Sequence, residues 1–296
     1  MGRLIPVALA VAFASASGCV VSLDHDGYIE HEEKRFDATS VVDLHLYTFD
    51  GSVEVRTWDR PEVVVDIQKR GQDKEAVSRI EVLSERTGNR IQIEARKPGG
   101  GGFVGIGRFV SSSAKLVASV PRNTDLVVRS GDGSILVERV NGRLELRTSD
   151  GSIRATETSG ELLAESGDGT IQLEEVAGVV EARTDDGSVR LTGTPAVVRA
   201  RTGDGGMTLR IRGGAAMTGD WTVTTGDGSI SMELPDEFDA DIEADPGSDG
   251  RARSELALTD VTGGTREQRV LRGRLGQGGH RLTIRTGDGS IRLLRY

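Results

Sequence analysis

The chain has few residues of several types on which other protein classes depend. Its single cysteine, Cys19, excludes a disulfide within the chain, so stability has to come from packing and hydrogen bonds. Aromatic residues amount to only 4% and prolines to 7. Because proline is scarce and the 40 glycines fall largely at repeated positions, the composition excludes a disordered low-complexity chain.

Basic residues are also in the minority. The 37 lysines and arginines are outnumbered by 46 aspartates and glutamates, which gives a formal net charge of −9. A nucleic-acid-binding protein needs a basic face, and no stretch of the sequence suggests one, so we expect no nucleic-acid partner. The four histidines show no metal-ligand spacing, and we expect no cofactor.

The apolar run at the N terminus is short. Arg3 is followed by LIPVALAVAFA and by the small residues SASG, and this segment ends at Cys19. Such a run is too short to span a membrane as a mature helix and is typical of a secretory signal peptide. The stretch ASGC (16–19) resembles the bacterial lipoprotein cleavage box, although Ala16 replaces the commoner leucine. This resemblance implies a lipoprotein signal peptide over 1–18, a lipid on Cys19, and an exported chain anchored through this lipid in the cell envelope, at the outer membrane or the cell surface. The alternative is an ordinary secretory peptide, whose cleavage would leave a free thiol.

An Asp-Gly turn recurs at one fixed spacing, with sequences such as GDGSILVE and SDGSIRAT. Five of these turns follow one another every 18 residues, at Asp132, Asp150, Asp168, Asp186 and Asp204. Related turns stand at Asp50, Asp227 and Asp288. A fixed period of this kind is typical of a solenoid, in which each unit buries its core only by stacking on its neighbours.

Each 18-residue unit divides into two halves of nine residues. Gly133 corresponds to Gly142, and Ile135 corresponds to Leu144. Alternation within each half predicts one strand with every second side chain inward. The predicted inward columns are Ile135, Ile153, Ile171, Val189 and Met207; Val137, Ala155, Leu173, Leu191 and Leu209; Leu144, Leu162, Val180 and Val198; and Leu146, Ala164, Ala182 and Ala200. The sequence therefore predicts an all-β, parallel β-solenoid with 18-residue, two-strand coils around a narrow core.

The remaining segments are less regular. Residues 19–35 are polar and aperiodic and are predicted to be a tether, followed by a single β-solenoid domain over 36–296. Residues 73–79 are compatible with one or two helical turns. The 61-residue gap between Asp227 and Asp288 breaks the period and predicts irregular coils or a hairpin. The last strand, SIRLLRY, is expected to form the C-terminal edge of the sheet.

The segment VEVRTWD, the repeated GDGSI and the closing TGDGSIRLL resemble the bacterial "putative adhesin" family of β-strand repeats, a domain of unknown function. The resemblance covers roughly residues 36–296. It implies a right-handed parallel β-solenoid, often on secreted or lipid-anchored envelope proteins. It assigns no catalytic residue.

Stacked coils would place the turn carboxylates in one column, where adjacent charges about 4.8 Å apart repel one another. Three arrangements would compensate for this repulsion. Ca²⁺ could bind at Asp132, Asp150, Asp168, Asp186 and Asp204. Arginines three residues before the aspartates, with exceptions at Glu165 and Thr224, could neutralise them. Each aspartate could instead cap its own turn, with glycine supplying a positive φ; the last two arrangements together are favoured over Ca²⁺.

Two other features bear on function. Asp185 beside Asp186 is the only doubled carboxylate among the turns, and a solvated turn is favoured over an enzyme site there. The Gly-rich loop 98–110 carries the apolar residues Phe103, Val104, Ile106 and Phe109, which would either contact a partner or cover an open end of the solenoid. Trp58 and Trp221 are expected in the core or at a cap rather than as a carbohydrate platform.

These observations favour a non-catalytic envelope lipoprotein that offers a rigid surface for adhesion, protein contact or scaffolding. Its partner would be an envelope protein or a surface ligand that the sequence does not name. The alternatives are a Ca²⁺-dependent binding module and, third, a glycan-active β-helix enzyme.

Overall fold

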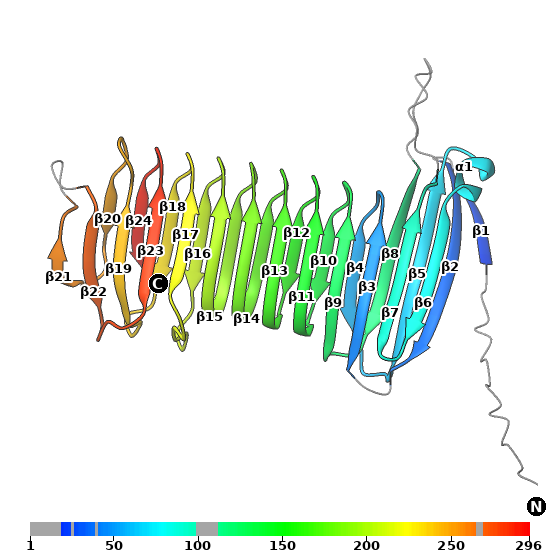
Figure 1. The fold of residues 1–296 in the computed structure, drawn as a ribbon, viewed down its shortest axis with the longest axis horizontal. Coiled ribbons are helices and arrows are strands. Elements are labelled where there is room, and N and C mark those ends of the chain that lie inside the picture. Colours follow the sequence, from blue (N-terminus) through cyan, green and yellow to red (C-terminus); the bar gives the residue numbers. More distant parts are fainter. Residues whose placement is uncertain (1–18, 25–26, 39–40, 99–111, 265–268) are drawn as a thin grey trace, which may run out of the picture.

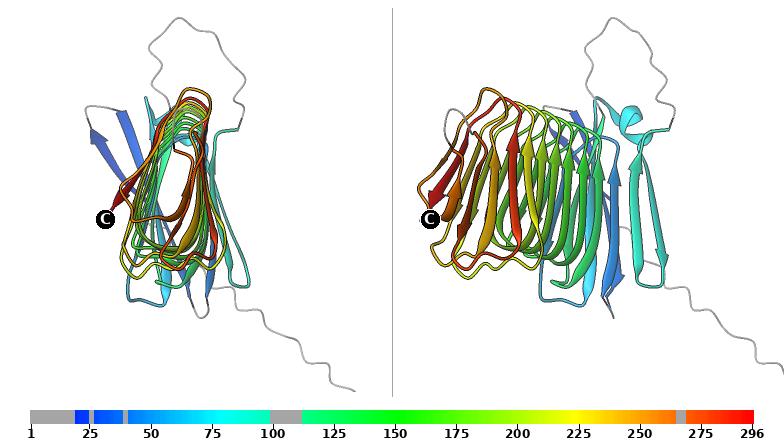
Figure 2. Two further views of the ribbon diagram at one scale, coloured as in Figure 1. Left: turned by 90° about the vertical axis from the view of Figure 1, so that its left-hand side faces the viewer. Right: turned by 60° about the vertical axis from the view of Figure 1, so that its left-hand side comes forward.

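The chain forms an elongated all-β rod, which confirms the all-β part of the predicted fold class (Figure 1). The computed structural model describes residues 19–24, 27–38, 41–98, 112–264 and 269–296. One sheet of 24 strands folds over, so that two long faces enclose a narrow core (Figure 2). Within the described residues there is one helix, α1 (Lys74–Ser78), whose N-cap is Asp73. No helix in these parts of the chain is long and apolar enough to cross a membrane.

The middle of the rod consists of coils that stack in sequence order and give one strand to each face. The first face, here called the β11 face, contains β9 (Thr124–Ser130), β11 (Asn141–Thr148), β13 (Ser159–Ser166) and the second halves of β14 (Ile171–Thr184) and β15 (Val189–Thr202). The opposite face, the β10 face, contains β10 (Ile135–Glu138), β12 (Ile153–Thr156), the first halves of β14 and β15, and β16 (Met207–Ile211). Parallel pairing joins residues 18 apart, such as Ile135 with Ile153 and Leu144 with Leu162.

The core lies between these two faces and follows the predicted inward columns. Every residue of the four columns is buried, and the most exposed of them, Leu162, is 6% exposed. Each buried leucine, isoleucine or valine contributes about 1.5–3 kcal/mol relative to an exposed side chain. Because three of the four residues in one column of the β11 face are alanines, the core between the two sheets is narrow and the rod is flat.

At the N-terminal end, one coil lies out of sequence order. The coil of β3 (Val42–Thr48) and β4 (Val53–Thr57) is enclosed between β9–β10 on one side and the later strands β7 (Arg90–Arg96) and β8 (Ser113–Val120) on the other. Antiparallel strands then close this end: β6 (Glu81–Thr87) pairs with β7, and β5 (Glu62–Gly71), β2 (Gly27–Asp37) and β1 (Cys19–Asp24) follow β8.

The tether predicted over residues 19–35 was wrong. Strand β2 pairs along its whole length with β5, and β1 pairs with β2. Apolar and polar residues do not alternate clearly in this segment, because the side chains of β2 are half-buried or exposed throughout. The sequence pattern therefore did not predict a strand here. The ladder of backbone hydrogen bonds to β5, rather than an apolar stripe, therefore holds β2 in the fold.

At the C-terminal end, the last coil of the chain is also enclosed. Strands β17 (Trp221–Thr225) and β18 (Ile230–Leu234) continue the middle, and β23 (Arg281–Thr286) and β24 (Ile291–Arg295) stack on them. The earlier strands β19 (Ala240–Asp245) and β20 (Ala252–Ser254) lie outside this last coil, and β22 (Leu271–Leu275) and β21 (Thr259–Thr262) end the β11 face.

The pairing corrects one expectation for this end and confirms the irregular coils or hairpin expected between Asp227 and Asp288, where β21 and β22 pair antiparallel. The last strand is not an edge, because β24 pairs with β18 on one side and β20 on the other. The 61-residue gap also does not interrupt the turns in space, since the backbone N–H of Gly287 donates to the Gly226 carbonyl oxygen at 2.5 Å. The turns at Asp227 and Asp288 are therefore neighbours.

Candidate functional site

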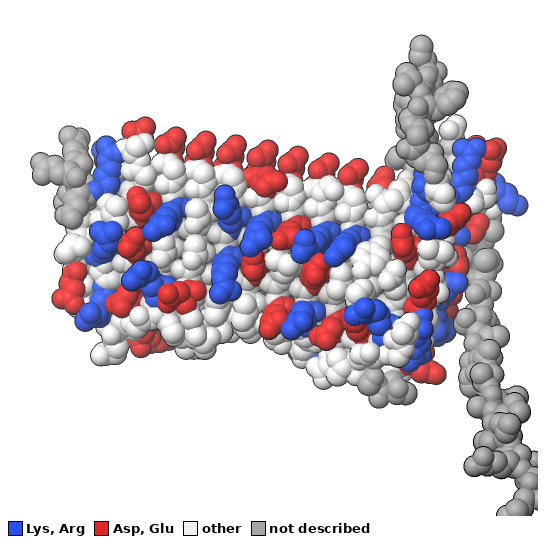
Figure 3. Space-filling view, viewed as in Figure 1, with Lys and Arg blue, Asp and Glu red and all other residues white. Residues whose placement is uncertain are grey.

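The Asp-Gly turns form one continuous edge along the rod. Their spatial order is Asp50, Asp132, Asp150, Asp168, Asp186, Asp204, Asp227 and Asp288, and all except the half-buried Asp50 are exposed. Figure 3 shows the resulting row of acidic side chains along one edge of the molecule. Among the described residues, the side chains of the exposed turn aspartates make no hydrogen bond or ion pair. Burial, and after it the charge of Asp132, raises the pKa of Asp50 above its usual value.

A column of buried hydroxyls caps these turns. Each hydroxyl residue lies two positions before a turn aspartate; the set is Thr48, Ser130, Thr148, Ser166, Thr184, Thr202, Thr225 and Thr286. In one example, the Gly187 N–H donates to the Thr184 hydroxyl at 3.2 Å, and this hydroxyl donates to the carbonyl oxygens of Gly167 and Gly169 at 2.8 and 3.1 Å. The hydroxyl thus caps its own turn and also ties it to the preceding coil.

The prediction that aspartate caps its own turn was therefore wrong. A serine or threonine in the column of buried hydroxyls accepts the backbone N–H instead, as Ser166 does from Gly169 at 3.0 Å. The signal was present in the sequence as an unbroken series of serine or threonine at the same repeat position. Its role could not be read there, because its second bond goes to the preceding coil.

The glycine after each aspartate is required by stacking. A Cβ added to Gly169 would lie 2.0 Å from the Gly151 carbonyl oxygen, and one added to Gly205 would lie 1.9 Å from that of Gly187. In this column only Gly51 has a positive φ, of 129°. The prediction that the glycines supply a positive φ was therefore wrong for the others, whose function is to let neighbouring backbones touch.

Arginine does not neutralise the acidic edge, contrary to the sequence prediction. On the β11 face Arg129 contacts Glu145 at 3.0 Å, and Arg147 contacts Glu145 and Glu165 at 2.9 and 2.8 Å. Arg183 and Arg285 pair with glutamates in the same way. The hydrogen bond from Arg129, together with both arginine charges, outweighs burial and lowers the pKa of Glu145. Alternation turns the arginine toward the flat face, where glutamates of the same and adjacent strands lie nearest.

The Ca²⁺ candidates share one edge but are not brought together as a metal site. Among the described residues, no group of three or more histidine, cysteine, aspartate or glutamate side chains could hold a metal ion. One carboxylate per coil gives a single column, whereas Ca²⁺ takes about six to eight oxygen ligands around one point.

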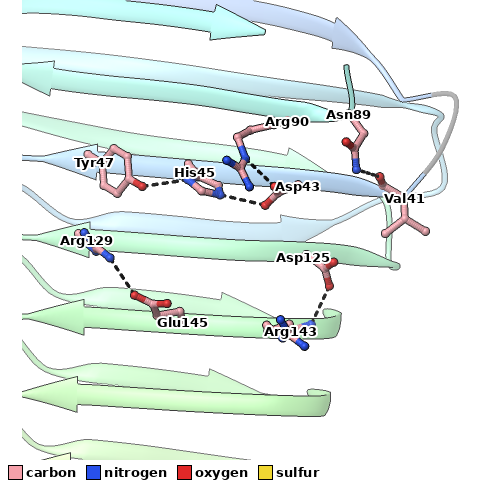
Figure 4. Close-up of polar contacts among 10 residues, drawn as sticks. All are labelled: Val41, Asp43, His45, Tyr47, Asn89, Arg90, Asp125, Arg129, Arg143 and Glu145. Carbon is pink, nitrogen blue, oxygen red and sulfur yellow. Dashed lines mark hydrogen bonds and ion pairs between the residues drawn. The ribbon is translucent and has the colours of Figure 1, made fainter. Parts of the chain in front are cut away.

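A second polar cluster lies on the β11 face near the N-terminal end (Figure 4). His45 lies between two neighbours on β3: its Nδ1 is 2.9 Å from the Tyr47 hydroxyl, and its Nε2 is 2.9 Å from Asp43 Oδ1. Arg90 donates to the other oxygen of Asp43 at 2.7 Å, and the Arg129 guanidinium lies 5.7 Å from the Tyr47 ring. Burial raises the pKa of Tyr47, with the Arg129 charge opposing it. These groups satisfy one another and order β3 against its neighbours.

The alternation of arginine and glutamate stops at β17. Thr222 and Thr224 stand opposite Arg199 and Arg201 of β15, and these two exposed arginines make no hydrogen bond or ion pair within the described chain. The short threonines between long side chains leave a hollow of about 250 Å³, here called the β15–β17 hollow, lined by Glu181, Arg183, Arg199, Ala200, Arg201, Thr222 and Thr224. In Figure 3 an uncharged band crosses the face near β17, with basic side chains beside it.

The family of the chain is shown by a comparison with family models. The family model Toastrack DUF4097 matches residues 41–294. The chain belongs to the Toastrack family. This confirms the predicted resemblance to a β-repeat family of unknown function.

Solved structures similar to this Toastrack chain are of low identity. One is a "putative cell adhesion protein" from Clostridium sporogenes ATCC 15579, with 11% identity and a TM-score of 0.31 over 90% of this chain and 100% of that chain. Another is a "putative adhesin" from Bacteroides fragilis NCTC 9343, with 10% identity and a TM-score of 0.39 over 90% of this chain and 97% of that chain. The comparison with curated proteins finds no match.

The remaining candidates of the Toastrack chain are the two tryptophans, Cys19 and the apolar residues of the Gly-rich loop. Trp221 is fully buried against Phe238, with ring centroids 5.4 Å apart, and Trp58 is half-buried and donates to the Glu62 carbonyl at 2.9 Å. Neither tryptophan is an exposed platform. Cys19 begins β1, at the edge of the sheet. The loop residues Phe103, Val104, Ile106 and Phe109 lie outside the described residues.

Proposed function

We propose that this Toastrack chain is a non-catalytic protein of the cell envelope. It is anchored by a lipid on Cys19 after loss of residues 1–18, and it presents the faces of its rod for adhesion, protein contact or scaffolding. Right-handed winding is part of this proposal, because parallel strands are joined by right-handed connections in almost all proteins.

The observation that carries the proposal is the fixed spacing of the coils. Strand pairing, the column of buried hydroxyls and the stacked glycines tie each turn to the next, as Thr202 does through the Gly187 carbonyl at 2.8 Å. Both ends are closed by enclosed coils. Outward side chains therefore keep one spacing along the rod, which suits a surface that meets an extended partner.

The position of Cys19 fits a membrane attachment at one end. Strand β1 lies at the N-terminal end of the rod, far from β21 (Figure 1). A lipid on this strand would leave both faces of the rod accessible above the membrane.

The anchor is tested in a bacterial host by metabolic labelling with a palmitate analogue. We expect label on the wild-type chain and recovery of that chain in the membrane fraction. Cys19→Ala should lose the label and move to the soluble exported fraction, whereas Ser17→Ala serves as the matched control and should keep both. A Cys19→Ala chain that stays labelled and membrane-bound would contradict the anchor.

The surface role is tested by crosslinking on intact cells. We expect the wild-type chain to capture partners, and we compare it with a variant that lacks residues 98–110, the predicted contact loop. Loss of partners with the loop would support the loop as the contact, and unchanged partners would support the faces of the rod. Absence of any partner on cells that carry the anchored chain would contradict the surface role.

The unpaired acidic edge favours Ca²⁺-dependent binding as the second candidate. Calorimetry on chelator-stripped protein distinguishes the two. Saturable binding of Ca²⁺ at micromolar concentration would favour the binding module over the metal-independent surface.

A further inference from the structure

The β15–β17 hollow is where two arginines of the β11 face, Arg199 and Arg201, have no acidic partner among the described residues, although Glu181 also lines it. In the column of Arg147, Glu165 and Arg183, the glutamate bridges its neighbours at 2.8 and 3.4 Å. Arg201 continues this column directly beside Arg183, and the next position is Thr224 rather than a second glutamate. Adjacent strands lie about 4.8 Å apart, so Arg183 and Arg201 repel each other with no acid between them.

The neighbouring column repeats this feature. Arg199 follows Glu181 on the adjacent strand, but Glu181 is already paired with Arg183. Beyond Arg199 the column continues with Thr222 and Thr283. Arg199 and Arg201 are two residues apart on one strand, so their backbones are about 6.6 Å apart and both side chains leave the same face.

Beyond the threonines, a further arginine borders the hollow region. Thr224 pairs in register with Arg201 on one side and with Arg285 on the other. A carboxylate placed over Thr224 would thus lie between two guanidinium groups. Arg285 keeps its own contact with Glu243 at 3.3 Å, which fixes its position without filling the hollow.

The shape and the lining limit what can bind. The hollow of about 250 Å³ is smaller than the roughly 300–1,000 Å³ of pockets that enclose small molecules, so it suits one unit of a longer chain lying on the face. Its lining offers guanidinium groups, which hold carboxylates through paired hydrogen bonds, and threonine hydroxyls, which both donate and accept.

The lining also argues against single-stranded and duplex nucleic acids and against neutral sugars. It contains no aromatic ring on which a base or a sugar could stack. A duplex nucleic acid carries one charge per about 1.7 Å of its axis, which is a denser row of charge than Arg199 and Arg201 can match. A polymer with one carboxylate and several hydroxyls per unit fits both the local charge and the lining.

We infer that the β15–β17 hollow binds an acidic polysaccharide, with Arg199 and Arg201 of β15 holding a uronate carboxylate beside β17 and with Thr222 and Thr224 contacting sugar hydroxyls. The inference rests on the proposed surface function and names the chemistry of the partner for one face.

The test measures binding of fluorescently labelled polygalacturonate oligomers to the purified full chain. We expect saturable binding that weakens as salt rises, because the contacts are exposed ion pairs. The double variant R199Q/R201Q should bind about tenfold more weakly, given the modest strength of exposed charged hydrogen bonds. R129Q/R147Q is the matched control, since it removes the same charge from paired positions of the same face, and it should bind within about twofold of wild type.

A second variant fills the hollow from within. Thr224→Glu should bridge Arg201 and Arg285 as Glu165 bridges Arg147 and Arg183, and should reduce polygalacturonate binding to the level of R199Q/R201Q. Its melting temperature should equal or exceed that of wild type, which excludes misfolding as the cause.

The remaining outcomes overturn the inference. They are equal losses in the two double variants, equal binding of neutral dextran, or tighter binding of single-stranded DNA or phosphatidylglycerol vesicles than of polygalacturonate. These outcomes leave the Cys19 labelling and the capture of partners on cells unchanged. Conversely, loss of labelling and partners with intact polygalacturonate binding would overturn only the surface function.

Discussion

The middle of the rod and its two ends use the same kind of coil but stack it in different orders. From β9 to β16 each coil rests on the preceding one in the sequence. At each end a coil is enclosed by segments that come later or earlier in the chain. The difference shows that repetition sets the coil, whereas closing the ends requires contacts between distant segments. Enclosed end coils have neighbours on both sides and do not fray as free edges would.

The largest effect is expected when the enclosed C-terminal coil is removed. Deleting residues 281–296 takes away four fully buried side chains, Leu282, Ile284, Ile291 and Leu293. At about 1.5 kcal/mol or more each, this removes at least about 6 kcal/mol of burial. Amide hydrogen exchange should show lost protection in β19–β22, while β9–β14 keeps its protection because coils depend on nearest neighbours. Unchanged protection in β19 would contradict the enclosed position of the last coil.

The next effect concerns the stacked glycines of the middle. Gly169→Ala places a methyl group 2.0 Å from the Gly151 carbonyl oxygen, so the backbone has to shift, at a cost of about 3 kcal/mol. Gly206→Ala is the control, since its nearest atom is 3.4 Å away, and it should stay within about 0.5 kcal/mol. Denaturant unfolding measures both. Equal destabilisation would show that chain flexibility rather than stacking governs these sites.

The stability of the N-terminal end should depend on a buried charge, that of Lys69, whereas the buried polar residues of the middle are uncharged serines and threonines. Lys69 is 8% exposed and contacts Glu30 and Glu32 at 3.0 and 3.1 Å. Lys69→Met removes the partner of Glu30 and leaves Glu32 with Lys34 alone, and it should cost about 2 kcal/mol at pH 7. Lys74→Met, on the exposed helix α1, is the control and should be near neutral.

The same lysine and glutamates make the stability of the N-terminal end depend on pH in the acid range. Burial raises the pKa of Glu32, but hydrogen bonds and charges from Lys34 and Lys69 outweigh it, so the pKa is lowered. A lowered pKa in the folded state gives stability that is present above the unfolded value, about 4.3, and is lost as pH falls through the folded value. Exchange of the β2 and β5 amides should therefore rise below about pH 4.3, and less so in Lys69→Met. A pH-independent β2 would contradict this pairing.

Two threonines of the middle should respond oppositely to valine. Thr184→Val removes the turn cap and should cost about 2 kcal/mol, because the Gly187 N–H loses its acceptor. Thr158 is 2% exposed, and its hydroxyl has no hydrogen-bond partner in the part of the chain that the structure describes. Buried valines stand 18 residues before and after it. Thr158→Val should therefore stabilise by about 1 kcal/mol. Thermal unfolding of both variants checks the sign, and destabilisation by both would contradict the assignment.

The smallest effect is expected at the acidic edge. The pKa of Asp50 is raised, so its contribution to stability is full below the unfolded value and is lost as pH rises through the folded value. Asp50→Asn should stabilise the chain at pH 7 by about 0.5 kcal/mol, and 1 M salt should remove only the smaller part of this gain, which comes from the Asp132 charge rather than from burial. Asp59→Asn, outside the edge, should show no gain. An Asp50→Asn chain no more stable than wild type at pH 7 would contradict the raised pKa of Asp50.

The candidate site could be predicted only in its composition. The column of arginines, with Thr224 as an exception, was visible in the sequence, but its partners were not. Alternation put Arg147 on the flat face with Glu145 and Glu165, rather than beside an aspartate three residues away. The β15–β17 hollow arises because the threonines of β17 stand opposite the arginines of β15, and only the pairing of β17 with the distant strand β23 sets Arg285 on the other side of Thr224.

By itself, the sequence determined the β-class, the 18-residue offset, the four buried columns and the short helix at Lys74–Ser78, because each of these depends on residues close in the chain or one period apart. Only the tertiary structure decided the order of the end coils, the strands within residues 19–35, the role of the turn glycines and the partners of the buried hydroxyls. These depend on which backbone lies one strand spacing away. Where the chain returns from a distant segment, no local pattern records that neighbour.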